Sequence, residues 1–356
     1  MKKIISLSLF QNWIRLVLAA FLFFCFSGCG GGSDKRLTLY TWEGMFPAEI
    51  MRSFEKETGY RINYVNFDSN ETMLSKLEAA NGGGYDLVIA DDYIVEAVIT
   101  GGLAQKLDKN QIPNYPNINP MYLLPFYDPQ GEYTVPYGAG VQTIVYDPSR
   151  AGVEINGFAD LWNSKLRGEI GITGNSRVIN GMALKVLGKS YNEENPAIIA
   201  EAGKLMLILA PNIRLIKDDN LQDDLLSGEV SVALMYTDHA TKAMLANPDL
   251  KMVFPREGIG YGLMAAFVPA KAPNPVAAQA FLNYIMDARR GAACFENLGY
   301  YCTFIASEPF IGEAYRKYLT LPEGFNINME TLRLVNEAAE EEHERVWTAF
   351  RAATGN

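Results

Sequence analysis

The length, composition and charge of the chain exclude several classes of protein. With 356 residues the chain is too long for one compact core, and this length favours about two domains. Hydrophobic residues make up 49% of the chain and charged residues 20%, a balance that excludes a disordered protein. The net charge of −10 argues against a nucleic-acid partner, because such binding depends on Lys and Arg side chains that neutralise phosphates.

The N-terminal residues have the features of an export signal. Basic side chains precede an apolar run, residues 16–26, which is too short for a membrane span of about 20 residues. Small residues then lead to Cys29, as in a bacterial lipobox. We predict a signal peptide over residues 1–28, lipidation of Cys29 and a flexible tether over residues 29–35. Cleavage near Gly28 without a lipid is the alternative.

The first part of the body alternates strands and helices. Residues 37–42 predict a short strand, and the helical pattern that follows ends at Gly59, a residue suited to a helix C-terminus. Residues 60–67 and 71–80 predict a second strand and a second helix. Residues 86–90 predict a strand that is apolar on both faces, as in the middle of a parallel sheet. This order is typical of a doubly wound α/β fold.

The same alternation restarts later in the chain. A Pro- and Asn-rich stretch, residues 112–128, interrupts it, and residues 158–250 resume it. Further predicted elements are strands at 133–137 and 142–146, a return strand at 262–268, a helix at 275–285 and acidic terminal helices that we expect to pack across both lobes.

These patterns predict a two-lobed α/β protein in which each lobe is a mostly parallel sheet with flanking helices. We expect the first lobe to comprise residues 36–139 and about 256–325, and the second to comprise residues 140–255 and about 326–356. Each lobe is therefore built from separate segments of the chain. A ligand cleft is expected between the lobes, at the carboxyl ends of the strands.

Cys294 and Cys302 are the cysteines that lie outside the leader. In an oxidising compartment this pair predicts either a disulfide or two buried free thiols. The histidines, His239 and His343, do not have the spacing to the cysteines that a metal site needs. We therefore expect no metal and no cofactor.

Several short segments together have the order and spacing of one family. They are Leu39–Trp42, Phe54–Gly59, Phe67–Glu71, Tyr85–Val88, Asp92–Tyr93, Val135–Tyr137, Ala159–Trp162, Pro211–Ile213, Gly228–Glu229, Pro255–Gly258 and Phe281–Tyr284. On these segments the chain resembles the periplasmic spermidine/putrescine-binding proteins of polyamine ABC importers. The resemblance implies a type II periplasmic-binding-protein fold, transport rather than catalysis, and an ABC permease as partner.

The resemblance also implies a ligand site. A polyamine needs carboxylates for its ammonium groups and aromatic faces for its methylene groups. By position, the family's site residues correspond here to Trp42, Asp92, Tyr93, Tyr137 and Tyr236.

The chain departs from the family at several acidic site positions. Two of them fall on Asn175 and Val178, and the carboxylate of the return strand falls on Met264. Neighbouring acids can replace them in another geometry, whereas nearby arginines favour an anionic or zwitterionic ligand such as an amino acid or a phosphonate. These replacement acids and arginines are Glu43, Asp91, Asp238, Arg177 and Arg333.

Other functions have weaker support in the sequence. The usual motifs of serine hydrolases, zinc peptidases and phosphate-binding loops are missing, so we expect that the chain is not an enzyme. A ferric-ion site would need clustered tyrosines, and the adjacent pair is Tyr300 and Tyr301, beside Cys302. We expect a monomer in the periplasm or on the outer face of the cell membrane, attached by its lipid alone.

Overall fold

The computed structural model describes residues 35–217, 220–320 and 328–355, and from Arg36 onward these residues belong to one compact unit. The predicted signal peptide, the lipidated Cys29 and all of the tether except Lys35 lie outside the described residues. No helix within the described ranges is long and apolar enough to cross a membrane.

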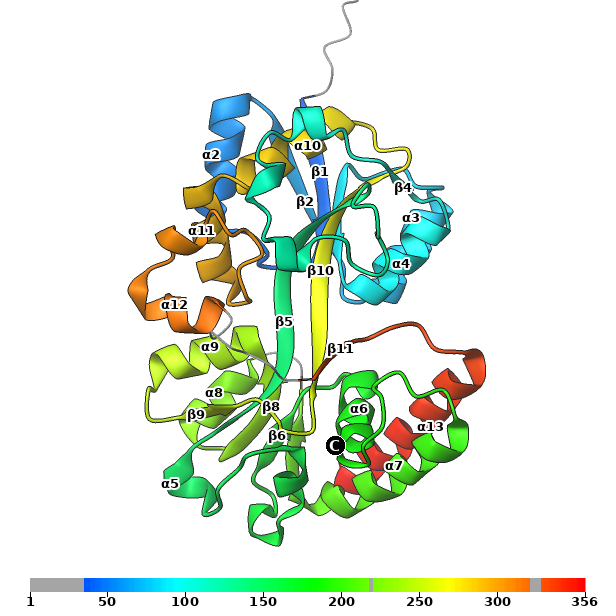
Figure 1. Ribbon diagram of the computed structural model, residues 1–356, viewed down its shortest axis with the longest axis vertical. Helices are drawn as coiled ribbons and strands as arrows, with labels where there is room; N and C mark the ends of the chain where they lie inside the picture. Colours follow the sequence, from blue (N-terminus) through cyan, green and yellow to red (C-terminus); the bar gives the residue numbers. More distant parts are fainter. Residues whose placement is uncertain (1–34, 218–219, 321–327, 356) are drawn as a thin grey trace, which may run out of the picture. The chain divides into compact units, whose positions relative to one another are not determined.

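The elements alternate along most of the chain (Figure 1). The strands are β1 (Arg36–Thr41), β2 (Arg61–Asn66), β3 (Leu87–Ala90), β4 (Ala104–Gln105), β5 (Thr134–Tyr146), β6 (Ile170–Ile172), β7 (Ile213–Ile216), β8 (Val232–Tyr236), β9 (Lys251–Val253), β10 (Ile259–Pro269) and β11 (Met329–Thr331). The α-helices are α2 (Ala48–Thr58), α3 (Asn70–Ala79), α4 (Asp92–Thr100), α5 (Pro148–Ala151), α6 (Ser176–Val186), α7 (Pro196–Leu209), α8 (Leu221–Ser227), α9 (Thr237–Ala246), α10 (Pro275–Ile285), α11 (Ala288–Leu298), α12 (Glu313–Leu319) and α13 (Glu337–Thr354).

The strands form a sheet that passes through both lobes. Its order is β2-β1-β3-β10-β5-β8-β6-β7, with β4 and β11 beside β10 and β9 beside β5. β5 pairs with β10 through Val141 and then with β8 from Gln142 onward. The two long strands, β5 and β10, therefore connect the lobes, as their central position in Figure 1 shows.

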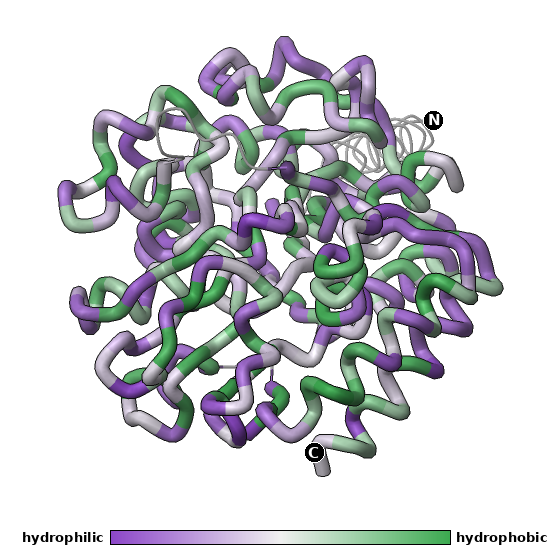
Figure 2. Tube along the Cα trace, turned by 60° about the horizontal axis from the view of Figure 1, so that its bottom comes forward, coloured by the Kyte–Doolittle hydropathy of each residue, from purple (hydrophilic) through white to green (hydrophobic). Residues whose placement is uncertain are grey.

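Separate hydrophobic clusters fill the two lobes. In the first lobe, helices α2, α10 and α11 cover one face of the sheet, and α3 and α4 cover the other. In the second lobe the largest cluster includes Phe158, Ile179 and Trp347. Figure 2 shows hydrophobic and hydrophilic residues alternating along the helical stretch that ends at the C-terminus, as expected for a helix with one buried face.

Most predicted elements are present, with two corrections. The two strands predicted at residues 133–137 and 142–146 are one continuous strand, β5, because Gly138 and Gly140 interrupt the pattern of β-forming residues but not the pairing with β10. The terminal segment was predicted to pack across both lobes, but α13 packs on α6 and α7 within the second lobe.

Candidate functional site

Aromatic side chains end the strands that lead to the candidate site. Trp42 follows β1 and is partly buried, with its ring 4.5 Å from the ring of Phe67 in an edge contact. Its carbonyl oxygen accepts a hydrogen bond of 2.6 Å from the Tyr64 hydroxyl. Tyr236 ends β8 and is also partly buried. Glu43, beside Trp42, is exposed.

The buried amide of Asn70 organises the polar groups that follow β3. Its Nδ2 donates to Asp91 Oδ2 at 2.8 Å and to the Tyr93 hydroxyl oxygen at 3.0 Å. The Tyr93 hydroxyl in turn donates to Glu71 Oε1 at 3.1 Å. Burial raises the pKa of Asp91, and the hydrogen bond from Asn70 opposes that rise. Two carboxylates and a phenol thus share one face of the first lobe.

Tyr300 connects this face to the second lobe. Its pKa is raised well above the usual value, first by burial and then by the negative charge of Asp238, with smaller effects of Tyr236 and Asp91. Tyr300 follows α11, whereas Asp238 lies in the first turn of α9. The pKa of this phenol therefore depends on charges from both lobes.

Glycine makes the position of Tyr300 possible. A Cβ atom at Gly140 would lie 2.7 Å from the Tyr300 ring, closer than real Cβ contacts come. Only glycine lets the ring lie against β5 at this point. Tyr300 and Asn70 were not predicted as site residues, although the two closely spaced glycines of β5 were the available signal for a close contact at Tyr300.

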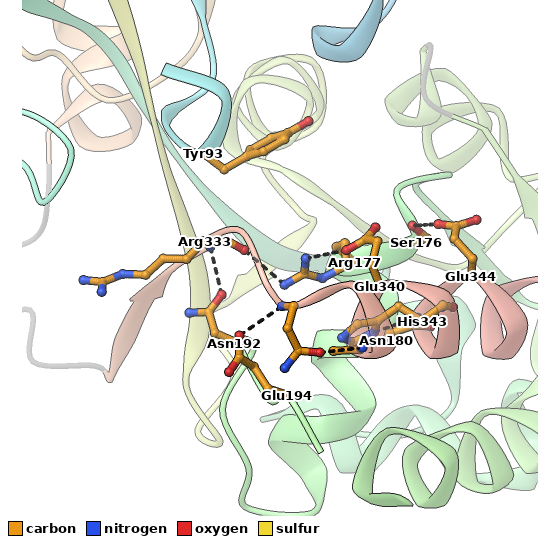
Figure 3. A network of polar contacts seen from close by, with 12 residues as sticks. Tyr93, Ser176, Arg177, Asn180, Asn192, Glu194, Arg333, Glu340, His343 and Glu344 are labelled. Carbon is orange, nitrogen blue, oxygen red and sulfur yellow. Dashed lines mark hydrogen bonds and ion pairs between the residues drawn. The ribbon is translucent and has the colours of Figure 1, made fainter. Parts of the chain in front are cut away.

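Arg177 lies on the second lobe in a network of polar contacts (Figure 3). Its Nη1 is 3.1 Å from Glu340 Oε2, and its Nη2 donates to the carbonyl oxygen of Arg333. Among the described residues, the buried Nε of Arg177 has no hydrogen-bond partner. Burial lowers the pKa of Arg177, with Glu340 and Tyr93 acting in the opposite direction.

Three predicted site residues make contacts away from the candidate site. Tyr137 is fully buried in the first lobe, where its hydroxyl donates to the carbonyl oxygen of Met45 at 2.9 Å. The Asp92 carboxylate is 2% exposed and accepts from the backbone N–H of Leu263 in β10. The Arg333 guanidinium lies 4.4 Å from the centre of the Phe126 ring, and Figure 3 shows it pointing away from Arg177. We therefore leave Tyr137, Asp92 and Arg333 out of the candidate site.

Cys294 and Cys302 are not joined by a disulfide in the structure. They are free thiols, and both are buried. Burial raises the pKa of Cys294 to about 12, and the Cys302 thiol donates to the carbonyl oxygen of Phe304. Of the two alternatives, the structure has the pair of buried thiols.

Apart from Arg177, the remaining candidate residues have a common chemistry. Carboxylates accept charge-assisted hydrogen bonds from ammonium groups, and aromatic faces attract cations. Such a site suits an elongated organic cation. The aromatic members are Trp42, Tyr93, Tyr236 and Tyr300, and the acidic members are Glu43, Glu71, Asp91 and Asp238.

Comparison with known proteins agrees with this chemistry. The model of the bacterial extracellular solute-binding protein family matches residues 49–310. Over 296 residues the chain is 32% identical to the spermidine/putrescine-binding periplasmic protein of Salmonella typhimurium. The alignment covers 82% of this chain and 84% of that protein. Over 364 residues it is 26% identical to the putrescine-binding periplasmic protein PotF of Escherichia coli, with coverage of 96% and 98%.

A solved structure has the same fold. It is the spermidine/putrescine ABC transporter substrate-binding protein PotD from Streptococcus pneumoniae, which superposes with a TM-score of 0.79 at 24% sequence identity. The match covers 90% of this chain and 99% of that protein.

Proposed function

Because the chain belongs to the family of bacterial extracellular solute-binding proteins, we propose that it captures a linear polyamine outside the cytoplasm and delivers it to the permease of an ABC importer. The proposal is supported by the charges around Tyr300, whose pKa is raised by burial, then by Asp238 of one lobe and less strongly by Asp91 of the other. A diamine or triamine between these carboxylates would have an acceptor from each lobe.

The proposed contacts divide between charge and aromatic surface. Asp91 and Asp238 accept hydrogen bonds from the ammonium groups, and Trp42, Tyr93 and Tyr236 cover the methylene groups. Each cation–π contact contributes about 0.5–2 kcal/mol. We propose binding without chemical change, so the chain is a carrier and not an enzyme.

Closure of the lobes on the ligand is the proposed mechanism. A ligand shifts the equilibrium between open and closed forms only through its different affinity for the two, so both lobes must contact it. Movement would be absorbed by β5 and β10, the strands that connect the lobes. The closed form would then dock on the permease.

The domain boundaries and the membrane attachment are also proposals. The assignment of residues 36–139 and about 256–325 to the first lobe, and of residues 140–255 and about 326–356 to the second, is supported by the separate hydrophobic clusters. Attachment through a lipid on Cys29, in the periplasm or on the outer cell surface, is supported by the sequence of the leader alone.

Calorimetric titration with putrescine and spermidine tests the proposed site. Asp238→Asn should weaken binding by about tenfold or more, because a hydrogen bond to a charged group contributes about 1.5–3 kcal/mol. Asp249→Asn, at an exposed position shortly after the C-terminal end of the same helix, is the matched control and should bind as the wild type does. Equal affinities of the two variants would remove Asp238 from the site.

A zwitterion with one ammonium and one carboxylate group is the second candidate ligand. It is favoured by one observation, the unpartnered Nε of Arg177 near Tyr93, since a guanidinium matches the geometry of a carboxylate. Putrescine and 4-aminobutyrate have the same chain length and differ in one terminal group. Preference for 4-aminobutyrate that disappears in Arg177→Met would establish the zwitterion, and preference for putrescine in both proteins would exclude it.

A further inference from the structure

A cavity lies beside the strands that connect the lobes. Its volume is about 200 Å³, and its walls come from three parts of the chain. Residues 121–127 and Asp92 belong to the first lobe, Tyr261 and Leu263 to β10, and Thr331 and Arg333 to the C-terminal connection. We call it the hinge cavity.

The hinge cavity and the candidate site lie on opposite faces of β10. Gly262 pairs directly with Gly140, the residue on which the Tyr300 ring lies. Successive side chains of a strand point to opposite faces, so Tyr261 and Leu263 point away from Tyr300. The hinge cavity is therefore separate from the site around Tyr300, Asp91 and Asp238.

The polar groups of the hinge cavity are incompletely satisfied. Asp92 Oδ2 accepts from Leu263 N at 3.1 Å and Oδ1 from Tyr93 N at 2.9 Å, which leaves acceptor capacity on both oxygens. The Tyr127 hydroxyl is buried and has no hydrogen-bond partner within the part of the chain that the structure describes. Burial, together with the charge of Asp91, raises the pKa of Asp92 to about 8.

The apolar lining suits a flat cation. The rings of Tyr122 and Tyr261 are stacked with their centres 6.5 Å apart. At the edge of the cavity the guanidinium of Arg333 already lies over the ring of Phe126, which shows that this wall accepts a cation on its aromatic face.

We propose that the hinge cavity is a second binding site, which takes a small primary amine or guanidine with a compact apolar body. The cationic group would pair with the ionised carboxylate of Asp92, whose proton is released to solvent on binding. The Tyr127 hydroxyl would complete the polar contacts, and the apolar body would lie against the tyrosine rings.

Occupancy of the hinge cavity is coupled to the angle between the lobes. Residues 121–127 move with the first lobe, whereas Thr331 and Arg333 belong to the connection that leads to α13 in the second lobe. A change of lobe angle therefore changes the shape of the cavity. A ligand that prefers one shape must alter the affinity of the main site, and the effect is reciprocal.

Calorimetric titration of the purified full chain with benzylamine tests the proposal, with benzyl alcohol as the uncharged analogue of the same shape. We expect saturable binding of benzylamine at least tenfold tighter than that of benzyl alcohol. Tyr127→Phe, which removes only the hydroxyl, should weaken benzylamine binding about threefold or more. Tyr318→Phe, in α12, is the matched control and should leave it unchanged.

Asp92→Asn should abolish the preference for benzylamine over benzyl alcohol. If Asp92→Asn does not fold, the result for Tyr127→Phe still tests the proposal. Asp238→Asn should leave benzylamine binding intact while it weakens putrescine binding. The proposal is overturned if wild type does not bind benzylamine, if Tyr127→Phe binds it unchanged, or if Asp238→Asn loses both ligands together. Loss of putrescine binding alone would count only against the proposed transport ligand.

Discussion

Adjacent carboxylates at the start of α4 have different surroundings and different roles. Asp91 is held by Asn70 and interacts with Tyr300, whereas Asp92 bonds to the backbone of β10 and lines the hinge cavity. The hydrogen bond to Leu263 lies where the pairing of β10 with β5 is irregular. Neighbouring residues that have the same charge therefore need separate functional assignments.

The buried thiols lead to a prediction about reactivity. Cys294 and Cys302 should resist alkylation by iodoacetamide in the folded protein, because only the thiolate reacts and burial disfavours it. Both should be labelled once the protein is unfolded, without any reductant. Mass spectrometry of the tryptic peptides provides the measurement, and labelling that requires a reductant would indicate a disulfide.

The two paired glycines of β5 and β10 have very different surroundings. A Cβ at Gly140 would meet the Tyr300 ring, whereas a Cβ at Gly262 would meet nothing within 4 Å. We predict that Gly140→Ala lowers the free energy of unfolding by about 1–3 kcal/mol through overpacking and weakens ligand binding. Gly262→Ala should be as stable as the wild type. Urea unfolding of both variants is the measurement, and equal stabilities would show that Tyr300 can move without cost.

The helices α6 and α13 are joined through buried His343, whose ring nitrogen Nδ1 is 3.1 Å from Asn180 Nδ2 (Figure 3). Burial, and then the charge of Arg177, lowers the pKa of His343 to about 4 from its usual 6.5. Between pH 4 and 6.5 the unfolded chain therefore binds more protons at this histidine than the folded protein does. The neutral histidine contributes stability above pH 6.5 that is lost as the pH falls towards 4.

We predict that His343→Gln removes this part of the acid sensitivity, on the order of 3 kcal/mol between pH 6.5 and 4. Asp92 acts in the opposite direction, because its raised pKa makes stability fall as the pH rises from 3.8 to about 8. The pH dependence of stability must therefore be compared between the wild type and the variants. His239→Gln is the control, and chemical unfolding at several pH values is the measurement. Parallel curves for wild type and His343→Gln would contradict the prediction.

The two lobes share one sheet but have separate hydrophobic clusters, which is the arrangement that hinge motion requires. If the ligand contacts Asp91 and Asp238 together, saturation with putrescine should favour the closed form. We predict a smaller radius of gyration in small-angle X-ray scattering with putrescine than without it. Asp238→Asn at the same putrescine concentration should change less. An unchanged radius for the saturated wild type would argue against closure.

Local sequence patterns were sufficient for much of the fold. Helix α10 begins and ends where its apolar period predicts, and α2 ends at Gly59, which adopts the left-handed conformation with φ of 74°. These features depend on residues close in sequence, through helix periodicity and the conformational freedom of glycine. The strands β1, β3 and β8 were predictable for the same reason.

Contacts between distant segments were not predictable in this way. Tyr137 was predicted as an aromatic site residue, but its ring packs against Phe46 and Phe295 in the core. In the sequence Tyr300 lies between Cys294 and Cys302, yet in the structure its pKa depends on charges from both lobes. Period and propensity specify which face of a strand a side chain occupies, but not which other element covers that face.

By itself, the amino-acid sequence determined the α/β order and a chemistry of acids and aromatic rings at strand ends, because each depends on local pattern and composition. Only the tertiary structure decided that Asp91 and Asp92 face different surroundings, that the two cysteines stay apart, and that a cavity lies behind β10. The physical reason is that burial, hydrogen bonding and charge depend on neighbours brought together from segments far apart in the chain.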